Sequence, residues 1–168
     1  MADDGSRKTS LTHLNDDGSA HMVDVSQKSV TVRTASAQAV LITTEEVTRL
    51  LAADDLPKSD ALSTARIAGI MAAKKTPELV PLCHPLPISK VSVEVQLDAP
   101  APGNALITAE VRTTGRTGVE MEALTAASVA ALTLYDMIKA VDRSAVITDQ
   151  QVLAKSGGRS GTWVRRAV

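Results

Sequence analysis

The sequence has almost no aromatic side chains: no phenylalanine, one tyrosine (Tyr135) and one tryptophan (Trp163) among 168 residues. A hydrophobic core must therefore be built from Val, Ile, Leu, Met and Ala, and such small side chains let secondary-structure elements pack closely. Because they bury less apolar area per residue, we expect further burial against identical subunits. The composition thus predicts a homo-oligomer.

Cysteine is also scarce, since Cys83 is the only one, which excludes an intrachain disulfide and is typical of a reducing compartment. The start MADDGSRKTS lacks the apolar segment of a signal peptide, and we find no apolar stretch long enough to span a bilayer. A net charge of -1 and a pI near 6.3 lack the basic excess of a nucleic-acid-binding protein. We expect a cytoplasmic protein that binds neither nucleic acid nor membrane.

The length is that of one domain, and no composition break marks a linker. We predict a disordered tail over residues 1–10 and a single domain over residues 11–168. Periodicity, capping and turn residues predict short strands at Val30, Val32 and Ala39–Thr43, helices over 43–53 and 59–75, a hairpin of strands Ile88–Leu97 and 105–113, a long helix Glu122–Asp142 and a last strand Ala145–Leu153. This order predicts an α+β, ferredoxin-like sandwich with an antiparallel sheet and helices packed on one face.

The segment PELVPLCHPLPISK sets Cys83 and His84 between Pro81, Pro85 and Pro87, whose rings stiffen the backbone. A rigid loop that presents a histidine orients a ligand well, although Cys83 can equally be a small buried residue and His84 a structural one. Neighbours in an extended segment point to opposite sides, which argues against a Cys83 nucleophile with His84 as its base. Three scattered histidines and one cysteine show no metal-ligand spacing, so we expect no metal.

Paired charges mark two further candidates. If Val119–Glu122 is extended, Glu120 and Glu122 share one face, where a carboxylate can hold the N–H edge of a guanine-type base; the alternative is that both only favour a helix start. Asp136 and Lys139 share a helix face among apolar neighbours. They form either a partly buried pair that moves protons or an ordinary surface ion pair.

Basic residues recur at the ends of predicted elements and beside glycines, where side chains and free N–H groups can meet phosphates. The loop KSGGRSG is the clearest example, with a flexible surface turn as the alternative. The candidates are Lys58, Lys74, Lys75, Lys155 and Arg159.

Five longer strings together resemble the molybdenum cofactor biosynthesis protein C family, the cyclic pyranopterin monophosphate synthases: AHMVDVS, TARIAGIMAAK, LVPLCHPL, TGVEMEALTAASVAALTLYDMIKAVD and LAKSGG. The resemblance covers nearly everything from Leu11 to Trp163. It implies a lyase that converts the 3',8-cyclised dihydro-GTP intermediate to cyclic pyranopterin monophosphate, releases pyrophosphate and needs no redox cofactor. It also implies that residues 11–168 form one catalytic, ferredoxin-like domain, assembled as a hexamer of dimers with sites at the dimer interface.

Position by position, Asp136 resembles the catalytic acid or base of the family and Lys139 its neighbouring lysine, and we group the basic position Lys58 with them. The other implied substrate-binding residues are Leu82, Cys83, His84, Met121 and Glu122, to which we add Glu120. Arg33, Lys74 and Lys155, like Lys58, resemble the basic residues that hold the phosphates. The resemblance also implies that His21 closes over the site. Two hypotheses from other classes stay open: a non-catalytic nucleotide-binding or assembly protein, and a metal-dependent phosphohydrolase.

Overall fold

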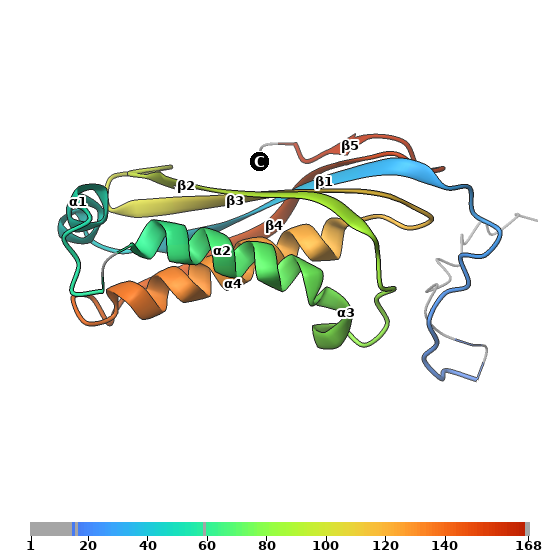
Figure 1. The fold of residues 1–168 in the computed structure, drawn as a ribbon, viewed down its shortest axis with the longest axis horizontal. Coiled ribbons are helices and arrows are strands. Elements are labelled where there is room, and N and C mark those ends of the chain that lie inside the picture. The colour runs from blue at the N-terminus through green and yellow to red at the C-terminus, as the bar shows by residue number, and fades with distance from the viewer. Residues whose placement is uncertain (1–14, 16, 59, 167–168) are drawn as a thin grey trace, which may run out of the picture.

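The computed structural model describes residues 15, 17–58 and 60–166, so the tail predicted at residues 1–10 lies outside the described residues. This part of the chain forms a five-stranded antiparallel sheet of order β2-β3-β1-β4-β5, with helices on one face (Figure 1). The connection β1–α2–β2–β3–α4–β4 confirms the predicted ferredoxin-like α+β fold. In chain order the elements are β1 (Thr31–Ile42), α1 (Glu45–Ala53), α2 (Ala61–Lys74), α3 (Thr76–Leu79), β2 (Ile88–Leu97), β3 (Asn104–Gly115), α4 (Glu120–Ile138), β4 (Val146–Ser156) and β5 (Trp163–Val164).

The central strand β1 is one continuous strand, where the sequence indicated separate short stretches. Ala35, Ala37, Ala39 and Leu41 alternate along it and are fully or almost fully buried, so one face of the strand lies against the helices. The continuous strand was not predicted from the sequence because alanine, unlike the β-branched residues, does not favour strands. β1 pairs with β3 over its whole length and with β4 on its other side.

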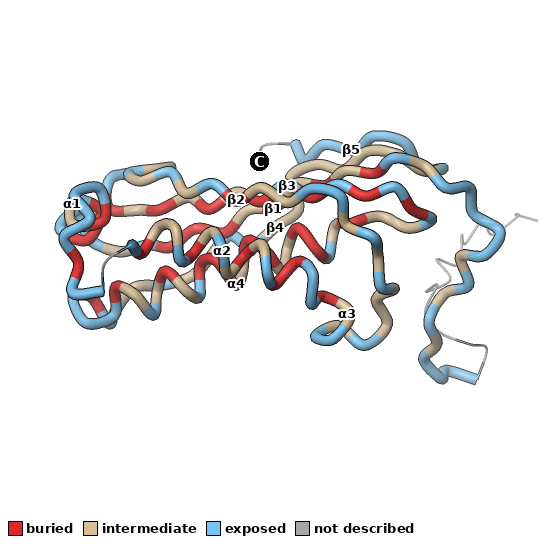
Figure 2. The backbone as a smooth tube through the Cα atoms, in the orientation of Figure 1, coloured by how far each residue is buried: buried red, intermediate tan, exposed pale blue. Residues whose placement is uncertain are grey.

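The helix layer is held together by small residues, as the absence of phenylalanine predicts. α2 packs on α4, and α4 in turn covers β1 and β3, so that buried backbone lies where the two layers meet (Figure 2). At Gly69 of α2, an added Cβ would lie 2.8 Å from the carbonyl oxygen of Ala126 and 3.1 Å from both Ala130 Cβ and Val93 Cγ2. The two helices bury many small residues, namely Ala65, Gly69, Ala72 and Ala73 on α2, and Ala123, Ala126, Ala127, Ala130 and Ala131 on α4.

The long helix α4 spans Glu120–Ile138, so it begins two residues before and ends four residues before the predicted Glu122–Asp142. Asp142 closes the following turn instead, where its carboxylate accepts hydrogen bonds from Thr43 Oγ1 and from the backbone N–H and Oγ of Ser144. By length and composition alone α4 is apolar enough to cross a membrane, whereas the sequence analysis found no apolar stretch of that length. Its apolar side chains pack against the sheet and α2, as expected for a core helix.

Other boundaries differ in ways that bear on the site. The predicted cap of α1 is confirmed, because Thr44 Oγ1 accepts a hydrogen bond from Val47 N at 3.3 Å. Pro77, expected only to follow α2, begins the separate short helix α3 as one of its first residues. β4 runs on to Ser156, so Lys155 is a strand residue, and β5 pairs with that end of β4.

We predict that Gly69→Ala destabilises the protein, although alanine is the better helix former. The added Cβ would meet the backbone of α4, which cannot rotate away, and overpacking of this kind costs about 1–3 kcal/mol. Chemical denaturation at fixed protein concentration measures the free energy of unfolding. Ser63→Ala, at a half-buried position of the same helix, is the control and should change stability by less than about 0.5 kcal/mol. An unchanged or increased stability of Gly69→Ala would contradict close packing between α2 and α4.

Candidate functional site

A cleft of about 320 Å³ opens at the N-terminal end of α4. One wall is the proline-rich loop that carries Cys83 and His84, and the floor is the first turn of α4 with Met121 and Glu122. The opposite wall comes from residues before β1, including Val23. The sequence-predicted residues Leu82, Cys83, His84, Glu120, Met121 and Glu122 all line this one cleft.

Within the cleft, Glu122 is only 3% exposed. Burial raises the pKa of its carboxyl group, and the neighbouring Glu120 raises it further. Cys83 is half-buried, and the pKa of its thiol is raised first by burial and then by the charge of Glu122. A thiol with a raised pKa is a poor nucleophile at neutral pH, so what the structure shows for Cys83 is a place in the wall of the cleft.

Of the two alternatives for Glu120 and Glu122, the structure shows the helix start rather than an extended segment. Both belong to the first turn of α4, two helical positions apart, and therefore point in different directions. Glu122 turns into the core beside the cleft, whereas Glu120 is half-buried and faces a second pocket as well. The helix start thus supplies one protected and one partly solvated carboxyl group.

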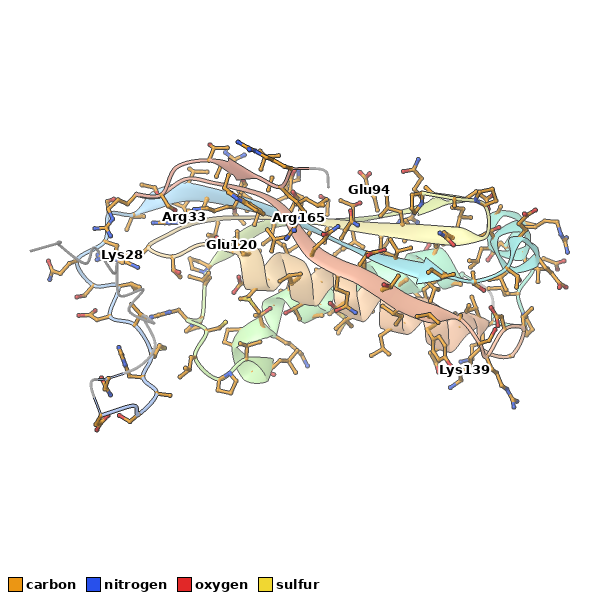
Figure 3. The ribbon with its side chains drawn as sticks, turned by 180° about the vertical axis from the view of Figure 1, so that it is seen from behind. Lys28, Arg33, Glu94, Glu120, Lys139 and Arg165 are labelled. Atoms are coloured by element: carbon orange, nitrogen blue, oxygen red, sulfur yellow. The ribbon has the colours of Figure 1, made fainter. Side chains whose placement is uncertain are left out.

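The second pocket, of about 180 Å³, is strongly basic and adjoins the cleft. Arg33 and Lys155, both predicted to hold phosphates, line it from the neighbouring strands β1 and β4. Figure 3 shows Lys28, Arg33 and Glu120 gathered at this end of the molecule. The two pockets share Lys28, Thr117, Gly118 and Glu120.

Glycines after β4 leave room for the Arg33 side chain. Arg33 is nearly buried, and its Nε donates a hydrogen bond to Gly115 O at 3.0 Å. An added Cβ at Gly158 would lie 2.1 Å from Arg33 Nη1, and Gly157 would meet Val32 O at 2.2 Å. Both glycines have positive φ angles, +92° and +70° for Gly157 and Gly158. The glycine-rich loop therefore packs closely against β1, with Gly158 beside the Arg33 guanidinium and Gly157 beside the backbone of Val32.

A separate charge cluster forms at the C-terminal end of α4. Asp136 Oδ1 lies 2.6 Å from Lys139 Nζ, and its Oδ2 lies 2.7 Å from Lys58 Nζ. Lys58 also donates a hydrogen bond to Asp136 O at 3.1 Å. The two lysines, Lys139 first, lower the pKa of Asp136 to about 2, and Asp136 raises the pKa of Lys139.

Of the two alternatives for this pair, the structure shows the surface ion pair, because Asp136 and Lys139 are 52% and 51% exposed. Their pKa values are displaced by mutual attraction instead, and both displacements favour the charged forms. The apolar residues around them in sequence face the core, while the helix turns this pair toward solvent. A single chain therefore presents an exposed carboxylate held between two ammonium groups.

The cleft and the charge cluster lie at opposite ends of the molecule. Glu122 and Asp136 are fourteen residues apart on one helix, which corresponds to about 21 Å. Figure 3 shows Lys139 at the far end from Lys28, Arg33 and Glu120. The predicted site residues thus form two separate groups within one chain.

Two predicted residues join neither group. Lys74 is an exposed residue at the end of α2, and it lines neither the cleft nor the basic pocket. His21 is half-buried near the start of the wall before β1 and is not a lining residue of either pocket.

Sequence reasoning missed the contributions of Lys28 and Arg116 to the basic pocket. Arg116 and Thr117 precede Gly118 in the turn between β3 and α4, and the string GRTG was a signal for such a position beside glycines. No comparable signal marks Lys28, which reaches the pocket through the path of the chain before β1. Among the residues that the structure describes, no group of three or more His, Cys, Asp or Glu side chains is placed to hold a metal ion.

Comparison with known proteins gives a consistent picture. The model of the MoaC family matches residues 22–158. The chain is 60% identical to a protein from Nocardioides sp. named cyclic pyranopterin monophosphate synthase, over 92% of this chain and 95% of that protein. It is 59% identical to the protein of that name from Streptomyces griseus, over 96% and 90%. Cyclic pyranopterin monophosphate synthase 2 of Mycobacterium bovis is 57% identical, over 95% and 94%.

We predict that Glu122→Gln stabilises the protein at neutral pH. Because burial raises the pKa of Glu122 above its unfolded value, the folded chain binds more protons than the unfolded chain between the two values, and stability falls as the pH rises through the folded pKa. Glutamine carries no charge to bury, so the stability gap between variant and parent should close as the pH falls below about 4.5.

The measurement is chemical denaturation across this pH range at fixed subunit concentration. The control is Glu94→Gln, at an exposed position on the open face of the sheet (Figure 3). It also removes one carboxylate charge, but a solvated one, so the unfolding midpoint should not change. A gap for Glu122→Gln that is the same at all pH values would contradict a carboxyl group with a raised pKa.

We predict that Gly158→Ala weakens the binding of inorganic triphosphate about tenfold, because the new Cβ displaces the Arg33 guanidinium and removes a charged contact. Isothermal titration calorimetry measures the dissociation constant. Gly161→Ala is the matched control, since Gly161 has a similar φ of +63° but no atom within 4 Å of an added Cβ. Equal weakening in both variants would indicate backbone strain rather than displacement of Arg33.

Proposed function

This chain belongs to the MoaC family, and we propose on that premise that it converts the 3',8-cyclised dihydro-GTP intermediate to cyclic pyranopterin monophosphate with release of pyrophosphate. It is accordingly an enzyme, a lyase of molybdenum cofactor biosynthesis that acts on a small nucleotide-derived substrate. We further propose that it works in the cytoplasm as a hexamer built from dimers.

The observation that carries the proposed substrate is the junction of the cleft with the basic pocket. The cleft offers a half-buried imidazole-bearing loop and a protected carboxyl group at Glu122, which suit the polar edge of a base. The adjoining pocket gathers four basic side chains, Lys28, Arg33, Arg116 and Lys155, which suit a phosphate chain. A nucleotide laid across Gly118 would place its two halves in matching surroundings.

The charge cluster at the other end of α4 supplies groups for proton transfer. With the pKa of Asp136 lowered to about 2 and that of Lys139 raised, both groups are charged in the single chain, so they can exchange protons only where the substrate competes with the contact between them. Ring opening and pyranopterin closure require several proton transfers of both kinds. Lys58 adds a second positive charge, which favours an anionic substrate and the departure of pyrophosphate.

Catalytic groups must lie within hydrogen-bonding reach of the atoms on which they act, about 3 Å. A substrate held in the cleft of one chain is about 21 Å from Asp136 of the same chain, so we propose that Asp136, Lys139 and Lys58 act on a substrate bound by a second copy. Large apolar side chains on the outer side of the helices support association, because Ile67, Met71 and Leu132 are more than half exposed in the single chain.

We expect Asp136→Asn and His84→Ala each to abolish turnover, measured as pyrophosphate and pterin release from the cyclised dihydro-GTP intermediate. If each site combines Asp136 of one copy with His84 of another, a mixture of the two inactive variants, unfolded and refolded together, should regain about a quarter of the parental activity. The reason is that half of the randomly formed two-fold dimers are mixed, and each mixed dimer has one intact site.

The matched control is the doubly substituted chain, unfolded and refolded alone, which should stay inactive. Size-exclusion chromatography should show that all variants keep the parental assembly. Turnover by Asp136→Asn alone would contradict its catalytic role, and an inactive mixture of folded, assembled variants would contradict a site built from two copies. Tight GTP binding without any product in the parent protein would favour the non-catalytic hypothesis.

A further inference from the structure

The wall of the cleft before β1 is a short irregular segment, residues 22–28, which we call the strap. Val23 and Val25 are half-buried and line the cleft, whereas Met22, Asp24 and Ser26 are exposed. This alternation places one side of the strap on the cleft and the other in solvent. The strap then turns and presents Lys28 to both the cleft and the basic pocket.

Hydrogen bonds within the strap set its shape but not its position. Asp24 accepts hydrogen bonds from the backbone N–H of Ser26 at 2.8 Å and from Ser26 Oγ at 3.1 Å. Lys28 N donates to Val25 O at 3.0 Å. These bonds form a local turn of the kind that Asp and Ser favour, and a turn held by so few bonds opens readily unless a further contact supports it.

Arg116 reaches the strap from the other side of the pocket. It lies in the turn between β3 and α4, directly after Gly115, and its Nη1 donates a hydrogen bond to Ser26 O. Because Ser26 O lies between Val25 in the cleft and Lys28 at the basic pocket, the contact fixes the strap at its turn. A charged donor makes this a stronger bond than one between neutral groups.

We propose that Arg116 is a positioning residue that anchors the strap across the cleft and thereby holds Lys28 at the phosphate end of the site. This role rests on the nucleotide site proposed above. Beside its charge at the basic pocket, Arg116 acts through the strap, where its contribution is to order a binding wall before the ligand arrives. Order present before binding lowers the entropy that the ligand must otherwise overcome.

The first measurement uses the full chain without ligand. Hydrogen–deuterium exchange at the hydrogen-bonded amides of Ser26 and Lys28 should be about tenfold faster in Arg116→Met, because loss of one charged hydrogen bond shifts local opening of the strap by about that factor. Arg116→Lys keeps a donor and should restore part of the protection. Arg112→Met is the matched control, since Arg112 is an exposed arginine of β3 that lines neither pocket, and it should leave exchange in the strap unchanged.

The second measurement is turnover of the cyclised dihydro-GTP intermediate. Arg116→Met should raise KM about tenfold while kcat stays near the parental value, because a binding wall is disordered and the reacting groups are untouched. Arg116→Lys should recover part of the loss, and Arg112→Met should match the parent.

The outcomes separate the two proposals. Unchanged exchange in ligand-free Arg116→Met overturns the anchoring role even if KM rises, because Arg116 would then be a direct phosphate ligand. Faster exchange with unchanged KM also overturns it, since the strap would not matter for binding. If Arg116→Met exchanges faster but the parent protein shows no turnover, the anchoring role is supported and only the proposed function is refuted.

Discussion

The close contact between α2 and α4 is the constraint on which the rest of the structure depends. Gly69 brings the two helices so near that a single methyl group would press on the α4 backbone, and alanines continue the contact along both helices. This seam fixes α4 against the sheet, and α4 carries site residues at both of its ends. The spacing between the cleft and the charge cluster is therefore as rigid as the helix that joins them.

The same shortage of large side chains that requires this seam also leaves the single chain with apolar surface to cover. A core rich in alanine and valine buries little apolar surface per residue, and large side chains such as Ile67 and Leu132 remain exposed on the helix layer. Packing with a second copy would cover such surface and could bring the charge cluster of one chain to the cleft of another. In that arrangement, stability and catalysis have a common origin: neither the apolar surface nor the site is complete in one chain.

Much of the fold could be predicted from the sequence because its signals are local. The alternation of β2 and β3, the Thr44 cap and the uninterrupted helical composition of α4 all depend on residues close in the chain. Likewise, the proline-rich loop and the start of α4 were expected to carry substrate-binding residues, and the structure places them in one cleft. What local patterns could not predict was distance, because Asp136 and Glu122 belong to one motif-rich helix yet lie at its two ends. The Arg116 contact with Ser26, ninety residues apart in sequence, is of the same non-local kind.

The two ends of α4 also treat their carboxyl groups in opposite ways. At the N-terminal end, burial raises the pKa of Glu122, so this group is the one nearer to a neutral, hydrogen-donating form. At the C-terminal end, two lysines lower the pKa of the exposed Asp136 to about 2 and keep it charged. Residues whose environments push their pKa values apart are suited to different parts of one reaction, Glu122 as a polar contact of adjustable charge and Asp136 as a fixed negative charge. A single helix creates both environments because its two ends, about 21 Å apart, lie in different surroundings.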